Sequence, residues 1–188
     1  MSYDLTLFRV AEGEDVADVF LRRAQAADAD DPNPGPGREE WEAEKRAWMR
    51  ELQGCVPGFE AFAFDYAAIA QAGGISEAEA RRRWRHIELS DDATGLQVTL
   101  YDESADVTLP YWHEGEAAAR AFEQMFRCAE VLAGAAGFAV FDPQLDQRVD
   151  AGSAADRGAA LGRYLQAKHA VERAIAMRGE KKAWWKFW

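Results

Sequence analysis

The architecture follows from residues 95–111, which read GLQVTLYDESADVTLPY. Apolar side chains alternate with polar ones before and after the central DES segment. A period of two is typical of strands that bury one face. Two such runs joined by a short polar turn predict a β-hairpin, with strands at Gln97–Tyr101 and Val107–Tyr111.

The segment after this hairpin predicts the main helix, Gly115–Ala133. Apolar residues recur there with the spacing of one helical face, at Ala118, Phe122, Met125, Phe126, Ala129, Leu132 and Ala133. Residues 134–137 contain two glycines and end the helix, and Phe138–Phe141 then predicts a strand.

The remaining patterns extend this arrangement towards both ends of the chain. Further strands are predicted at Tyr3–Val10 and His86–Leu89, and further helices over 16–26, 38–53, 76–84 and 154–178. The pattern over 59–74 is mixed. We therefore expect one α+β domain, 1–178, in which a small, mostly antiparallel sheet packs against several helices. The 115–133 and 154–178 helices should supply most of the core. A Pro/Gly/Asp-rich loop, 28–37, lies inside the domain, and a basic aromatic tail, 179–188, follows it.

Charge is distributed unevenly along the 188 residues. The chain has 22 Lys and Arg against 33 Asp and Glu, a net charge of −11. The segment from Asp156 to Trp188 has eight basic and three acidic residues, so residues 1–155 carry −16. Such an acidic body repels nucleic acid and attracts a basic protein partner. The N-terminus lacks the apolar region of a signal peptide, and no run is long enough to span a membrane, so we expect a cytoplasmic protein.

Motifs that would indicate catalysis or a cofactor are absent. His113-Glu-Gly-Glu lacks the second histidine of a zinc-binding helix, because position 117 is alanine. No glycine-rich phosphate loop or nucleophile elbow occurs, and the two cysteines, Cys55 and Cys128, do not form a metal-binding pair. We expect no metal, no cofactor and no enzymatic activity. The alternative is a hydrolase or transferase whose site is built from Asp102, His113 and Asp142, which would have to converge on one pocket.

Two groups of residues are candidates for binding a partner. The first lies near predicted strand ends and comprises Asp102, Trp112, His113, Asp142 and Gln144. Aspartates at turns also serve their own backbone, so a structural role is the competing interpretation. The second group is the tail, with Lys181, Lys182, Trp184, Trp185, Lys186, Phe187 and Trp188. The tail could dock on the acidic body, insert into a partner, or make weak contact with a membrane surface.

Three segments, 95–102, 109–113 and 137–144, together with Tyr3-Asp4-Leu5, resemble a family of small uncharacterised bacterial proteins. The resemblance covers about two-thirds of the chain and implies the same order of hairpin, helix and strand. It implies no activity. The charge distribution and the missing motifs favour a non-catalytic acidic protein that binds a basic partner, for example an immunity or antitoxin-like inhibitor of a bacterial toxin.

Overall fold

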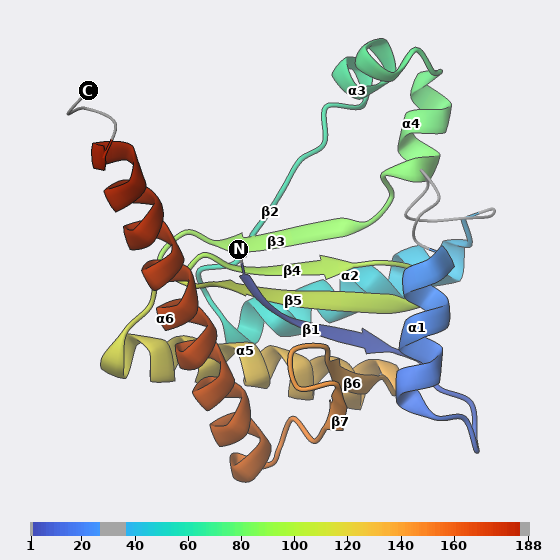
Figure 1. The fold of residues 1–188 in the computed structure, drawn as a ribbon. Helices are drawn as coiled ribbons and strands as arrows, with labels where there is room; N and C mark the ends of the chain where they lie inside the picture. Colours follow the sequence, from blue (N-terminus) through green and yellow to red (C-terminus); the bar gives the residue numbers. More distant parts are fainter. Residues whose placement is uncertain (1, 27–36, 185–188) are drawn as a thin grey trace.

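The predicted hairpin forms the middle of a seven-stranded antiparallel sheet in the computed structural model (Figure 1). The structure describes residues 2–26 and 37–184. The strands are β1 (Ser2–Phe8), β2 (Glu60–Ala61), β3 (Ile87–Asp91), β4 (Leu96–Leu100), β5 (Ser104–Pro110), β6 (Ala139–Asp142) and β7 (Gln147–Val149). The helices are α1 (Val16–Ala26), α2 (Glu39–Cys55), α3 (Tyr66–Gly73), α4 (Glu77–Arg83), α5 (Gly115–Ala136) and α6 (Ala154–Trp184). The predicted α+β fold is confirmed.

The order of the strands is β2-β3-β4-β5-β1-β6-β7. The N-terminal strand β1 therefore lies inside the sheet, where it pairs with β5 from Ser2–Pro110 to Phe8–Ser104. On its other side it pairs with β6 over Thr6–Phe8 only. β1 therefore joins the β4–β5 hairpin to the β6–β7 hairpin, and the first residues of the chain hold the two hairpins in one sheet.

One face of the sheet carries the main core and is covered by α2 and α5 (Figure 1). The inward residues of β1, β4 and β5 alternate along each strand as the hairpin pattern requires. Phe122 of α5 is fully buried, with its ring centroid 5.2 Å from that of Tyr3 and 4.9 Å from that of Tyr164. Gly137 then ends α5 with φ 67°, a left-handed conformation that glycine adopts without steric cost.

The second core helix is α2 rather than α6, which corrects the prediction. Trp48 and Leu52 of α2 are buried, and the ring centroid of Trp48 lies 5.3 Å from that of Phe138. Of the α6 side chains that the structure describes, only Ala160, Tyr164 and Lys168 are buried. The reason is geometric: α6 crosses one end of the sheet and presents a narrow stripe to the core (Figure 1).

Several predicted boundaries were also wrong. β1 ends at Phe8, and β5 begins at Ser104. Helix α5 continues through Gly134 to Ala136, and α6 continues to Trp184, so the boundary predicted at 178 falls inside a helix. Two short strands, β2 and β7, and helix α3 were not predicted. The predicted loop at 28–37 lies outside the described residues, apart from Gly37.

Candidate binding surface

The second face of the sheet is polar, and of the described helices only α1 packs against it, at its β6 end (Figure 1). Cross-strand pairing places side chains in rows, because residues directly opposite each other in antiparallel strands share a face. One row contains Glu60, Ser90, Gln97, Thr108 and Asp4, and the next contains Glu88, Thr99, Asp106 and Thr6. We call these nine residues the open face.

Every charged residue of the open face is acidic. The open face holds four carboxylates, and strands β1 to β5 contain no lysine or arginine. Arg23 of α1 borders it and donates from Nη2 to Ser104 Oγ at 2.7 Å. An antiparallel sheet commonly exposes one face to water. Exposure to water requires polar side chains but not charges of a single sign.

Burial and, after it, neighbouring negative charges raise the pKa of groups on and beside the open face. Burial raises the pKa of Asp106, the negative charge of Asp4 adds to this effect, and the Thr6 hydroxyl opposes it with a hydrogen bond. Burial and then the charges of Asp106 and Glu88 raise the pKa of the neighbouring Tyr101 to about 12. A carboxylate held at an energetic cost in the folded state is a common sign of a functional surface.

Trp112 lies at one end of the open face and is 64% exposed. Its indole packs over Gly95, where an added Cβ would lie 2.2 Å from Cζ2 of the tryptophan and 2.9 Å from Pro110 Cγ. Gly95 also has φ 67°, so the turn between β3 and β4 requires glycine for both its conformation and its contact. Exposed tryptophans held on a rigid base are frequent anchors in protein interfaces.

Asp102, a predicted partner-binding residue, is instead buried in an ion-pair cluster. Its Oδ1 accepts from Lys45 Nζ at 2.9 Å, and its Oδ2 accepts from Arg85 Nη2 at 2.6 Å. Burial alone would raise the pKa of Asp102, but the hydrogen bonds from Arg85 and Lys45 outweigh it and lower the pKa. The cluster ties α2 to the β4–β5 turn, which is a structural role.

His113 lies at the opposite end of the β4–β5 hairpin from Asp102. Its Nε2 is 2.6 Å from the carbonyl oxygen of Thr94, so Nε2 carries the proton and donates it there. Its backbone N–H donates to the hydroxyl of Tyr164, which in turn donates to the carbonyl oxygen of Pro110 at 2.8 Å. His113 therefore helps to fasten α6 to the end of β5.

Asp142 and Gln144 complete the edge of β1 beyond the point where β6 turns away. Asp142 is fully buried; its Oδ2 accepts from the Tyr3 hydroxyl at 2.5 Å and its Oδ1 accepts from the backbone N–H of Gln144. The Gln144 amide meets the backbone of Asp4 in either orientation; turned with its nitrogen inward, it donates to Asp4 O at 2.9 Å. Gln144 thus bonds backbone of β1 that the short β6 does not reach, whereas Asp142 holds the turn after β6 and ties it to the Tyr3 side chain.

The structure does not bring Asp102, His113 and Asp142 together. Each has a separate set of partners, and none of the described contacts joins His113 to a carboxylate. The tail candidates from Trp185 to Trp188 lie outside the described residues. Lys181, Lys182 and Trp184 belong to the last turns of α6, where only the backbone is described.

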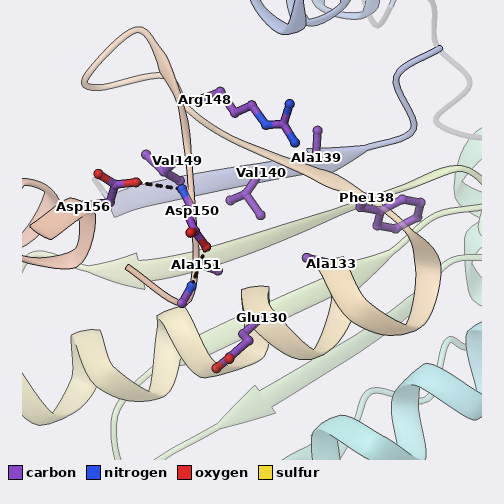
Figure 2. Close-up of a pocket in the computed structure, with 11 residues that line it drawn as sticks. Glu130, Ala133, Phe138, Ala139, Val140, Arg148, Val149, Asp150, Ala151 and Asp156 are labelled. Carbon is purple, nitrogen blue, oxygen red and sulfur yellow. Dashed lines mark hydrogen bonds between the residues drawn. The ribbon is translucent and has the colours of Figure 1, made fainter. Parts of the chain in front are cut away.

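A pocket of about 550 Å³ lies beside the β6–β7 hairpin (Figure 2). Two of its three carboxylates already serve nearby turns: Asp156 Oδ2 accepts from the backbone N–H of Asp150 at 2.8 Å, and Asp150 Oδ1 accepts from that of Gly152. Glu130 and Arg148 lie on opposite sides of the labelled group in this view. Within residues 2–26 and 37–184, no set of three or more histidine, cysteine or acidic side chains is placed to hold a metal ion.

Comparisons with known proteins found no match. No family model, no curated protein and no solved structure matches the chain. The resemblance to small bacterial proteins stays a prediction. Of the helices in the part of the chain that the structure describes, none is both long and apolar enough to cross a membrane.

The carboxylates of the open face were not among the predicted site residues. The signal that could have found them is the composition of the strands, because β1 and β3 to β5 alternate correctly yet place only acidic and neutral residues outward. Recognising that signal requires knowing that, of the described helices, only α1 packs against this face and does so at the β6 end, which the sequence of the strands does not reveal.

Proposed function

We propose that this protein is a non-catalytic binding protein whose open face engages a basic protein partner. The observation that carries the proposal is the open face itself, which combines four carboxylates, no lysine or arginine in strands β1 to β5, and a centre that none of the described helices covers. An immunity or antitoxin-like inhibitor of a cationic toxin is one concrete form of this function, because such partners meet by charge complementarity.

The size of the face indicates how a partner would sit. Five strands about 4.8 Å apart and about five residues long give roughly 19 by 17 Å, or roughly 320 Å² in projection. A stable interface buries about 800 Å² on each partner. The partner would therefore extend past the strands, and Trp112 at one end provides an exposed aromatic anchor next to the acidic rows.

The competing explanation is that the acidic residues only keep the protein soluble. Solubility depends on net charge and is indifferent to which face carries it. A functional face instead predicts that position matters at constant net charge. The chain offers a matched pair of variants that separate the two explanations.

The face variant is Asp4→Asn/Glu60→Gln/Asp106→Asn. The control variant is Glu40→Gln/Glu51→Gln/Glu123→Gln, which removes the same charge from exposed positions of α2 and α5. Immobilised wild-type protein and both variants would be exposed to extract from the source organism at low and high salt, and retained proteins identified by mass spectrometry.

The proposal predicts one basic protein that is retained by the wild type and the control variant, is lost with the face variant, and elutes with salt. Reconstitution with the purified partner should then show a loss of affinity of about tenfold or more for the face variant only. An acidic partner, or equal losses for the two variants, would contradict the proposal.

A further inference from the structure

A cleft separate from the open face lies between α2, the β2–α3 segment and the start of β3. Its volume is about 1010 Å³, the size of sites that take small molecules. Three kinds of side chain in its lining could recognise a ligand: arginines, aromatic rings and one buried histidine. Each kind supplies a different interaction, and together they define the chemistry of a ligand.

The arginines make this cleft basic in a protein of net charge −11. Arg38, Arg46, Arg81 and Arg85 line it against two glutamates, Glu39 and Glu42. Arg85 is committed to Asp102, and Arg81 pairs with Glu77 outside the cleft. Arg46 is exposed and has no ion-pair partner among the described residues, so it can meet an anionic group of a ligand.

The aromatic side of the cleft exposes a ring that a compact domain would ordinarily bury. Phe62 is 60% exposed and meets Phe64 edge-on at 5.1 Å. Phe64 in turn packs edge-on against His86 at 4.9 Å. This row of rings offers a planar ligand both a stacking surface and an apolar wall.

His86 supplies the most specific feature of the cleft. It is 8% exposed, and its Nε2 lies 3.0 Å from Glu88 Oε1. Burial lowers the pKa of the ring, which favours the neutral form. With Nε2–H donating to Glu88, Nδ1 is an acceptor, and it is a buried atom with no hydrogen-bond partner among the described residues. Leaving such an atom unpaired is costly, and a ligand N–H would satisfy it.

We propose that this cleft binds an anionic heteroaromatic amine, such as an adenine nucleotide. The ring would stack beside Phe62, the amino group would donate to Nδ1 of His86, and the phosphate would meet Arg46. The cleft meets the open face at Glu88, the partner of His86, but Asp4, Glu60 and Asp106 do not line it, and the proposal does not depend on the basic partner proposed above.

Four probes separate the three interactions, and isothermal titration calorimetry of the full chain measures them. AMP carries the ring, the amino group and the phosphate. IMP has an acceptor in place of the amino group, adenosine lacks the anion, and inorganic phosphate lacks the ring. We expect AMP to bind at least about tenfold more tightly than each of the other three, because each comparison removes one interaction.

Variants test the residues that carry each interaction. Arg46→Ala and Phe62→Ala should each weaken AMP binding about tenfold, whereas Arg127→Ala and Leu21→Ala, also exposed but far from the cleft residues in sequence, should not change it. His86→Phe keeps the ring shape and should abolish the preference for AMP over IMP. The face variant should bind AMP as the wild type does, which separates failure of this proposal from failure of the previous one.

Three results would overturn the proposal. AMP could fail to bind at millimolar concentration, it could bind no more tightly than inorganic phosphate, or it could bind equally well to the wild type and to both Arg46→Ala and Phe62→Ala. Arg46→Ala and Phe62→Ala alter exposed side chains, so they test the proposal even if His86→Phe does not fold.

Discussion

Replacing Lys45 by methionine tests the buried ion-pair cluster that holds α2 to the sheet. Lys45 is fully buried, and its Nζ lies 2.9 Å from Asp102 Oδ1, 2.8 Å from the carbonyl oxygen of Arg85 and 2.7 Å from Glu42 Oε1. Methionine keeps most of the aliphatic stem but leaves these three acceptors without their shared donor. Removing one partner of a buried ion pair costs about 3–5 kcal/mol. Since Arg85 still neutralises Asp102, we expect a loss of about 3 kcal/mol.

Urea denaturation followed by circular dichroism at pH 7 measures this loss. Lys45→Met/Asp102→Asn should lose less than the sum of the two single variants, by about 1–3 kcal/mol, because the two side chains share one interaction. Arg46→Met is the control; it alters the next, exposed residue of α2 and should change stability by less than about 0.5 kcal/mol.

The same cluster should make stability depend on pH. The folded state lowers the pKa of Asp102, so its contribution is present above the unfolded value of about 4 and is lost as pH falls through the lower folded value. The difference between the wild type and Asp102→Asn should therefore shrink towards pH 2. A loss below about 1 kcal/mol for Lys45→Met at pH 7, or a difference that grows on acidification, would refute this account of the cluster.

Three further predictions concern the core, the open face and its turn. Phe122→Ala should lower the free energy of unfolding in urea by about 3–5 kcal/mol, because the ring is fully buried against Tyr3 and Tyr164; a loss below about 1 kcal/mol would mean that α5 packs differently. Asp106→Asn should make the protein more stable at pH 7 and equally stable below the usual aspartate pKa, because the raised folded pKa penalises the charged form increasingly as pH rises; urea melts at pH 3 and pH 7 decide this, and a loss at pH 7 contradicts it. Gly95→Ala should cost about 1 kcal/mol or more from its positive φ and displace the Trp112 indole, which an altered emission maximum of the tryptophan fluorescence would report; an unchanged spectrum and melting temperature would count against the contact.

The hairpin and α5 could be predicted because each buries one face, and burial leaves a period in the sequence. Leu96, Val98 and Leu100 recur every second residue because they are buried on one face of β4. The apolar residues of α5, Phe122 among them, recur at helical spacing for the same reason. Strands β2 and β7 are two and three residues long, too short to show a period at all. β2 exists only through its pairing with β3, which lies about 26 residues further along the chain, and β7 only through its pairing with β6 in a local hairpin.

The sequence predicted the negative charge of the candidate binding surface but not which residues form it. The charge of −16 over residues 1–155 indicated an acidic binding surface, and the turn aspartates were natural candidates. Asp102 and Asp142 proved to be buried because Lys45 and Tyr3 reach them from distant elements. Lys45 occupies a position in line with Trp41, Trp48 and Leu52 on the inner stripe of α2, and a charge on such a stripe is the one sign of the cluster that the sequence contains.

Carboxyl footprinting of the complex tests the central claim most directly. Solvent-accessible carboxylates are labelled with a carbodiimide and an amine, with and without the captured partner, and the labelled sites are read by mass spectrometry. The account predicts that the partner protects Asp4, Glu60 and Asp106 and leaves Glu40 and Glu123 on the helical side unchanged. Protection of the helical carboxylates, with the open face still labelled, would contradict it.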